Sequence, residues 1–177
     1  MNRFLIIFIL TAVTALFTAD AHNPRPHRPQ RPAAERHERP HRHQPYVISN
    51  GEVFFEGRIV KDADARSFKT LRDGYARDTW CVYFDGRKIP DADSNSFKTL
   101  QDGYARDTWS VYLDGRKIPD ADSQSFKVLR DGYTRDTWRV YFNGQKIPDA
   151  DPLSFKVLRD GYAQDTWNTY YFGRLAR

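Results

Sequence analysis

The chain has 177 residues, of which 29% are charged, with a formal net charge of +5 at pH 7. The charge is uneven: His22 to Pro45 carries six arginines against two glutamates, whereas Tyr46 to Arg177 has 21 basic and 20 acidic residues. All five histidines also precede Tyr46, so the rest of the chain lacks a side chain with an unperturbed pKa near neutrality. This composition argues against acid–base catalysis, and we expect neither an enzyme nor a cofactor.

The first 21 residues are typical of a secretory signal peptide. Arg3 supplies the positive charge, Phe4 to Phe17 is an uncharged, mostly apolar run, and Ala19-Asp20-Ala21 has the small residues of a cleavage site. Fourteen residues rise only about 21 Å as a helix, which is too short for a hydrocarbon core of about 30 Å. We therefore expect an exported chain in the periplasm or outside the cell, without a membrane anchor after cleavage and without a nucleic-acid partner.

Residues 22–45 form a His-, Arg- and Pro-rich segment that we expect to be a disordered linker. The segment has no aromatic and no β-branched residue, and so cannot bury enough apolar surface to offset the entropy of ordering. Imidazoles in such a tract bind metal ions loosely, which makes the segment a candidate metal site. Its histidines are His22, His27, His37, His41 and His43.

From Asp73 onward the chain repeats every 29 residues. The sequence Asp-Gly-Tyr-Xaa-Xaa-Asp-Thr-Trp starts at Asp73, Asp102, Asp131 and Asp160. A fixed period of this size marks a repeat array and favours a scaffold or binding surface. We expect a repeat domain over 46–177, with a degenerate first copy at 46–72, full copies from 73, 102 and 131, and a truncated last copy at 160–177.

Each repeat predicts short antiparallel strands joined by tight turns. Asp-Gly or Asn-Gly occurs twice in each complete unit, for example at Asp131-Gly132 and Asn143-Gly144, and favours type I′ turns. The runs between the turns are short and rich in aromatic and β-branched residues. The expected fold is all-β, a meander or solenoid-like array. A one-turn helix at the Asp-Xaa-Xaa-Ser-Phe segments remains an alternative to extended chain, because Asp151-Pro152 suits a helix start.

The sequence resembles the DKNYY repeat family. The similarity rests on Tyr-Ala-Arg-Asp-Thr-Trp-Ser-Val-Tyr-Leu-Asp-Gly-Arg-Lys-Ile-Pro-Asp-Ala-Asp, from Tyr104 to Asp122, and covers nearly all of Tyr46 to Phe172. The resemblance implies a bacterial repeat protein, often exported, and supplies no catalytic residues. The chain departs from the family pattern at one place, where Thr-Trp replaces Lys-Asn after the aspartate.

That departure makes the tryptophans the first candidate binding residues. A row of exposed indoles could stack on an envelope glycan or contact a protein partner. Strand alternation favours the opposite interpretation, because Trp138, Val140 and Phe142 would share a core-facing side. Both interpretations stay open at this point for Trp80, Trp109, Trp138 and Trp167.

The other large aromatic positions are predicted core: Tyr75, Tyr104, Tyr133 and Tyr162, with Phe68, Phe97, Phe126 and Phe155.

Two further features carry weaker predictions. The Asp-Ala-Asp pairs, such as Asp120 and Asp122, resemble calcium-loop spacing, but the loop lacks the glycine and the bidentate glutamate, which favours Asx turns. Cys81 is the only cysteine, and Ser110, Arg139 and Asn168 hold its equivalent positions, so we expect an exposed thiol and consider an intermolecular disulfide.

The sequence thus predicts a non-enzymatic scaffold at the cell envelope. A metal-binding protein that works through the histidine segment, and an inhibitory or immunity-type partner of a secreted protein, are the alternatives.

Overall fold

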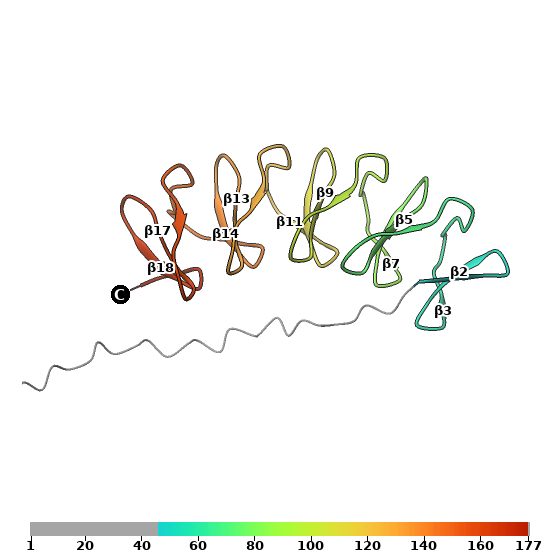
Figure 1. Ribbon diagram of the computed structural model, residues 1–177. Coiled ribbons are helices and arrows are strands. Elements are labelled where there is room, and N and C mark those ends of the chain that lie inside the picture. Colours follow the sequence, from blue (N-terminus) through green and yellow to red (C-terminus); the bar gives the residue numbers. More distant parts are fainter. Residues whose placement is uncertain (1–45, 177) are drawn as a thin grey trace, which may run out of the picture. The chain divides into compact units, whose positions relative to one another are not determined.

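A computed structural model describes residues 46–176 of the chain, and the predicted signal peptide and histidine segment lie outside them. The described residues form 19 short strands and no helix. They make five small antiparallel sheets that follow one another in chain order (Figure 1). The all-β repeat prediction is confirmed, and the one-turn helices are not formed.

The first sheet has three strands and the other four sheets have four strands each. The strands are β1 (Val47–Ser49), β2 (Glu52–Phe55) and β3 (Arg58–Ile59); β4 (Lys69–Thr70), β5 (Tyr75–Arg77), β6 (Val82–Phe84) and β7 (Arg87–Lys88); β8 (Lys98–Thr99), β9 (Tyr104–Arg106), β10 (Val111–Leu113) and β11 (Arg116–Ile118); β12 (Lys127–Val128), β13 (Tyr133–Arg135), β14 (Val140–Phe142) and β15 (Gln145–Lys146); β16 (Lys156–Val157), β17 (Tyr162–Gln164), β18 (Thr169–Tyr171) and β19 (Arg174–Leu175).

The predicted Asp-Gly turns have the backbone that their sequence favours. Asp114 and Gly115, between β10 and β11, have φ of 47° and 74°, and Asp102 and Gly103, between β8 and β9, have φ of 57° and 71°. Two successive residues at positive φ define the type I′ turn, which matches the twist of the flanking strands. Each turn fixes the register of the two strands that it joins, so that Leu113 pairs with Arg116 and Thr99 pairs with Ala105.

Each segment that leads from one sheet to the next contains two turns, and the sequence reasoning missed the first of them. Pro119 is followed by Asp120 at a φ of 57°. Proline followed by a residue at positive φ is the pattern of a type II turn, and Asp tolerates that conformation better than most residues. Three residues later, the Asp-Xaa-Xaa-Ser segment forms a second turn where a helical turn was considered.

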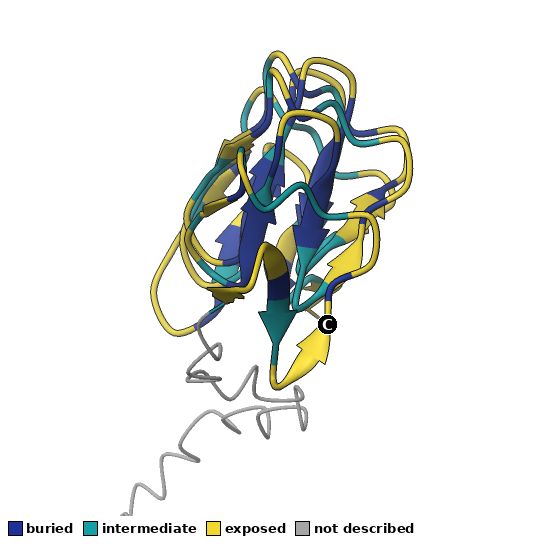
Figure 2. Ribbon diagram, turned by 90° about the vertical axis from the view of Figure 1, so that its right-hand side faces the viewer, coloured by how far each residue is buried: buried dark blue, intermediate teal, exposed yellow. Residues whose placement is uncertain are grey.

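The hydrophobic core lies between consecutive repeats. Tyr75, Val82 and Ile89 of one repeat pack against Phe97, Ala105 and Tyr112 of the next. The same arrangement recurs along the array. Figure 2 shows the central strands buried and much of the edge strands exposed. We call the side of a sheet that packs on the following repeat its front face, and the side that packs on the preceding repeat its back face.

Tyrosine hydroxyls join the repeats through glycine backbone. Tyr75 Oη donates to Gly103 O at 3.1 Å, and Gly115 N donates to Tyr75 Oη at 2.9 Å. A Cβ on Gly115 would lie 2.7 Å from the Cβ of Phe84 in the preceding repeat. The close approach therefore requires glycine at this turn, for space as well as for φ. The predicted tyrosine and phenylalanine core is confirmed except at Tyr162, which is half-buried because no described repeat packs on the front face of its sheet.

Candidate binding surface at the tryptophan loops

The four tryptophans lie in the loops that join the two central strands of each sheet. In the second sheet, this loop runs from Asp78 to Cys81, and the Asp78 amide donates to the Cys81 carbonyl at 2.9 Å. The side chains of Trp80, Trp109, Trp138 and Trp167 are 78%, 80%, 71% and 81% exposed. We call these four residues the Trp row.

The core interpretation of the tryptophans is therefore wrong. It assumed that strand alternation runs through Trp138, but β13 ends at Arg135 and β14 begins at Val140. Trp138 lies in the loop between them, where the two-residue period of a strand does not apply.

An aspartate holds each tryptophan loop in place, and it is buried in the first three loops and half-buried in the last. Asp107 is only 3% exposed, and its Oδ1 accepts hydrogen bonds from the amides of Trp109 at 2.8 Å and Ser110 at 2.7 Å. Its Oδ2 accepts from the Tyr112 hydroxyl at 2.8 Å and from the Asp93 amide at 3.0 Å. The carboxylate thus closes an Asx turn and ties it to a buried tyrosine and to the linking segment.

The aspartates in the first and last of these loops are stabilised as anions. Burial would raise the pKa of Asp78, but hydrogen bonds from the amides of Asp64, Cys81 and Trp80 and from the Tyr83 hydroxyl outweigh it and lower the pKa. The pKa of Asp165 is lowered for the same reasons, with Asp151 and Tyr170 among the donors. Hydrogen bonds to the charged form favour that form.

The second aspartate of each Asp-Ala-Asp pair is also a loop acceptor. Asp122 accepts from the Gln124 amide at 3.1 Å and from the Ser125 hydroxyl, and Ser125 Oγ in turn accepts from the Thr137 amide at 2.9 Å. The Asx-turn interpretation is thus confirmed, and these carboxylates are used to position Thr137, the neighbour of Trp138. Among residues 46–176, no group of three or more His, Cys, Asp or Glu side chains is placed to hold a metal ion.

Hydrogen bonds between repeats fix one tryptophan loop relative to the next. Ser123 Oγ donates to the carbonyl of Asp107, and Arg106 Nη1 donates to the carbonyl of Ser123 at 2.6 Å. Gln124 Nε2 also donates to the Thr108 carbonyl at 3.0 Å. Because two of these bonds end on carbonyls of the loop, those of Asp107 and Thr108, this tryptophan loop is tied to the segment that leads into the next sheet.

Exposed polar and cationic side chains accompany the Trp row. Each of the four-stranded sheets has a lysine at the start of its first edge strand, paired with the last residue of β5 or its equivalent, at the tryptophan end of the sheet. These lysines are exposed: Lys69, Lys98, Lys127 and Lys156. The exposed side chains of Arg66, Asn95 and Gln124 lie on the turns that support the loops. The surface therefore combines apolar faces with hydrogen-bond donors.

The expectation of an exposed thiol at Cys81 is wrong. Cys81 is 8% exposed and belongs to the core between the first two sheets, beside Tyr83. Arg139 occupies the equivalent position without being fully buried, because its guanidinium turns outward to donate to the Asp120 carbonyl at 2.7 Å. The presence of arginine at the equivalent position therefore did not show that the position is exposed. The intermolecular disulfide stays an untested prediction, and it would need local opening of the fold. The predicted metal site at His22, His27, His37, His41 and His43 lies outside the described residues.

The buried aspartates are the important residues that the sequence reasoning did not single out. Their signal was present, since each is followed five residues later by a tyrosine that becomes its hydrogen-bond donor, as in Asp136 and Tyr141. Within residues 46–176 no helix is long and apolar enough to cross a membrane.

The fold and the Trp row together define an all-β tandem-repeat protein with a repeated exposed aromatic surface. The model of the DKNYY family matches residues 46–174, and the chain belongs to that family. No curated protein and no solved structure matches it.

Proposed function

We propose that this chain is an exported, non-enzymatic binding scaffold of the cell envelope and that the Trp row is its contact surface. The observation that carries the proposal is the exposure of four indoles at equivalent, hydrogen-bonded positions of a repeat array. Large aromatic side chains that are exposed to solvent at regular spacing, on a rigid backbone, are typical of a surface that recognises another molecule.

The loop itself does not need tryptophan. Asp107 binds the backbone amide of Trp109, and any residue other than proline offers that amide. In the described part of the chain, no hydrogen bond uses an indole nitrogen of the Trp row. The fold thus requires the aspartate but does not require the tryptophan. We therefore attribute the tryptophan to binding.

The ligand that suits this surface best is an envelope glycan. An indole offers a flat apolar face that stacks on the C–H face of a sugar ring, and the neighbouring lysine, asparagine and glutamine side chains can donate to hydroxyl or carboxylate groups. A surface that repeats with the chain is also matched to a polymer that repeats. The signal-peptide pattern at 1–21 would place the protein where such polymers occur.

The array offers little for catalysis, which supports a binding role. It has no histidine, and its one cysteine is buried. Its recurring buried carboxylates are engaged by backbone amides and tyrosine hydroxyls, as in Asp107 and Asp136. Four equivalent sites of this kind serve to position loops.

The test is a graded series of tryptophan-to-alanine variants. Binding to polysaccharide isolated from the envelope would be measured by calorimetry and by co-sedimentation. We expect each lost indole to weaken binding by roughly two- to tenfold, which is the range for one aromatic stacking contact. Ile48→Ala is the matched control, because it removes an exposed apolar side chain outside the Trp row.

The proposal would be contradicted if a variant with all four tryptophans replaced by alanine bound the polysaccharide as tightly as the parent. A different result would change the ligand but not the surface. If the parent binds no polysaccharide but captures a protease-sensitive partner, and the variant without tryptophans does not capture it, the ligand of the Trp row is a protein.

A further inference from the structure

Within residues 46–176, the first sheet of the array has a back face that no repeat covers. In the inner repeats this face is buried: Ala105 and Tyr112, for example, are 0% and 1% exposed because the preceding repeat packs on them. The equivalent residues of the first sheet are Val47 on β1 and Phe54 on β2. A Cβ on Gly57 of this sheet would have no atom within 4 Å, in contrast to the crowded Gly86 and Gly115 of the next two sheets.

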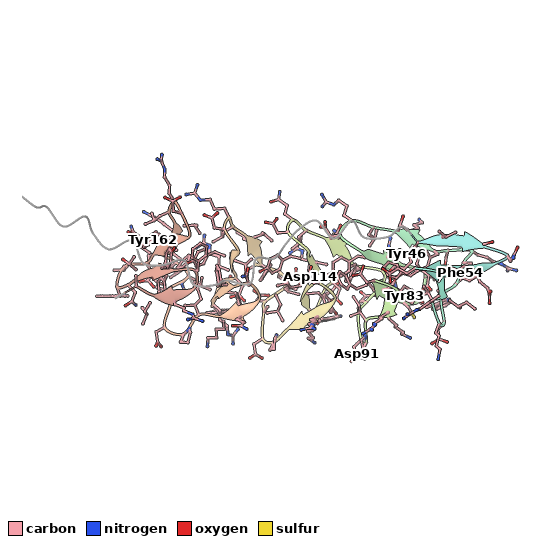
Figure 3. The ribbon with its side chains drawn as sticks, turned by 90° about the horizontal axis from the view of Figure 1, so that it is seen from below. Tyr46, Phe54, Tyr83, Asp91, Asp114 and Tyr162 are labelled. Atoms are coloured by element: carbon pink, nitrogen blue, oxygen red, sulfur yellow. The ribbon has the colours of Figure 1, made fainter. Side chains whose placement is uncertain are left out.

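Three apolar side chains form a continuous stripe on this face. Val47 pairs with Phe54, and Phe54 pairs with Ile59 on β3, so the three residues stand side by side across the sheet. Val47 is 53% exposed, Ile59 is 55% exposed and Phe54 is half-buried. Figure 3 labels Phe54 at this end of the array. We call Val47, Phe54 and Ile59 the N-terminal stripe.

The stripe is more apolar than the same positions elsewhere. Where the first sheet has Phe54, the other sheets have a tyrosine bonded to the loop aspartate, and where it has Ile59, the next three have lysine: Lys88, Lys117 and Lys146. A terminal repeat that only ended the array would be expected to become more polar on its outer face. The opposite change indicates that another surface covers the stripe.

With residues 1–21 removed as a signal peptide, the preceding chain does not have the composition to cover it. Residues 22–45 contain two alanines and six prolines, with no aromatic, leucine or β-branched residue. Such a segment offers little apolar surface to pair with valine, phenylalanine and isoleucine.

The C-terminal end of a second copy is also a poor match. Its front face has Thr169 and Ala176 at the positions of Val82 and Ile89, so the apolar contribution is reduced. Gln164 replaces the arginine that reaches the next repeat, and Ala65 replaces the serine that bonds the preceding repeat. A head-to-tail junction would therefore lack two of the hydrogen bonds that join inner repeats.

We propose that the N-terminal stripe packs against the same stripe of a second copy, giving a two-fold symmetric dimer. The contact would bury the one back face that no described repeat covers, with Phe54 near its centre. An isologous contact of this kind is closed, so it stops at two copies, whereas a head-to-tail contact would propagate. The dimer would carry eight exposed tryptophans, although its formation does not depend on what the Trp row binds.

The test is sedimentation equilibrium on the purified full chain and two variants. Ile59→Lys installs the residue that the next three repeats carry, so the variant is expected to fold, with an unchanged far-ultraviolet circular dichroism spectrum. Thr169→Lys places the same charge on the front face at the other end. We expect a dimer for the parent and for Thr169→Lys, and dimer dissociation at least about tenfold stronger for Ile59→Lys, because each dimer would bury two lysines.

Each other outcome overturns the dimer. A parent that is monomeric across the concentration range shows that copies do not cover the stripe. Species larger than two, dispersed by Thr169→Lys, show head-to-tail association instead. A dimer that Ile59→Lys leaves intact places the contact elsewhere.

Discussion

At the scale of single residues, the structure separates two roles that lie next to each other in the sequence. The aspartate of each Asp-Thr-Trp segment is buried or half-buried and accepts the hydrogen bonds that hold the loop, whereas the tryptophan side chain two residues later is exposed. The two side chains should therefore respond differently to substitution, with stability depending on the aspartate and binding on the tryptophan.

Asp107→Asn tests the first half of this separation. The amide group would place a donor against the Asp93 amide and remove the charge that four donors share, so we expect a loss of about 2–4 kcal/mol in the free energy of unfolding. Trp109→Ala is the comparison and should change stability by less than about 0.5 kcal/mol. Urea denaturation followed by circular dichroism measures both. Equal losses in the two variants would mean that the indole is structural.

One repeat carries a residue that its own pattern disfavours. Thr134 stands where the other three four-stranded sheets have Ala76, Ala105 and Ala163, and its buried hydroxyl makes no hydrogen bond of normal geometry among the described residues. The nearby Tyr104 hydroxyl, beside Thr134 and Gly144, is the one inter-repeat tyrosine hydroxyl that also makes no hydrogen bond of normal geometry. We infer that the threonine disturbs the junction to which Tyr104 belongs.

Thr134→Ala should therefore stabilise the chain by about 1 kcal/mol, because a buried hydroxyl without a partner is lost. A pair of tyrosine variants checks the explanation. Tyr75→Phe removes a hydroxyl bonded to Gly103 and Gly115 and should cost about 1 kcal/mol, whereas Tyr104→Phe should cost much less. The explanation fails if both phenylalanine variants lose the same stability.

At the scale of turns and strands, the sequence was a good guide wherever the backbone decides the outcome. Asp-Gly pairs need positive φ at both positions, and the structure has it at every such pair, including Asp73-Gly74 and Asp131-Gly132. Side-chain burial in the short loops was harder to predict. The exposure of Trp138 could not be predicted because a loop interrupts the two-residue period of the strands. The burial of Cys81 could not be predicted because its equivalent Arg139 has a long side chain, which reaches solvent from a position where a short side chain is buried.

The links between sheets should make stability depend on pH at both extremes. The lowered pKa values of Asp78 and Asp165 mean that these carboxylates stabilise the fold above their unfolded pKa of about 3.8, and that this stability is lost as the pH falls through the lower folded values. Tyr46 titrates in the opposite range, since burial raises its pKa from 10.0 to about 12. Its contribution is complete below pH 10 and is lost as the pH rises towards 12.

We therefore expect the urea midpoint to be flat between about pH 5 and pH 9 and to fall on either side. Circular dichroism is the suitable measurement, because the exposed indoles report poorly on unfolding. Tyr46→Phe should reduce the alkaline loss and leave the acid loss unchanged. A midpoint that changes near pH 7 would contradict this assignment, since the described residues contain no histidine.

At the scale of the whole molecule, each core belongs to two neighbouring repeats, so the repeat is a unit of packing that is not stable alone. Stability in such an array is approximately a sum of repeat and junction contributions. Removing one whole period should keep every remaining junction, whereas removing part of a period should destroy two of them.

Deletion of residues 102–130 removes 29 residues and joins Gln101 to Asp131, where the sequence continues with the next Asp-Gly-Tyr. We expect a folded chain with four sheets and a lower urea midpoint, with three tryptophans remaining. Deletion of residues 102–115 removes about half as many residues, including β9 and β10, and leaves two edge strands without the centre of their sheet. The smaller deletion should be the more damaging, because Tyr75, Val82 and Ile89 then lose Ala105 and Tyr112, on which they pack. Circular dichroism and urea denaturation of the two variants decide the matter: if the whole-period deletion is the less stable of the two, the junctions between repeats do not act as independent units.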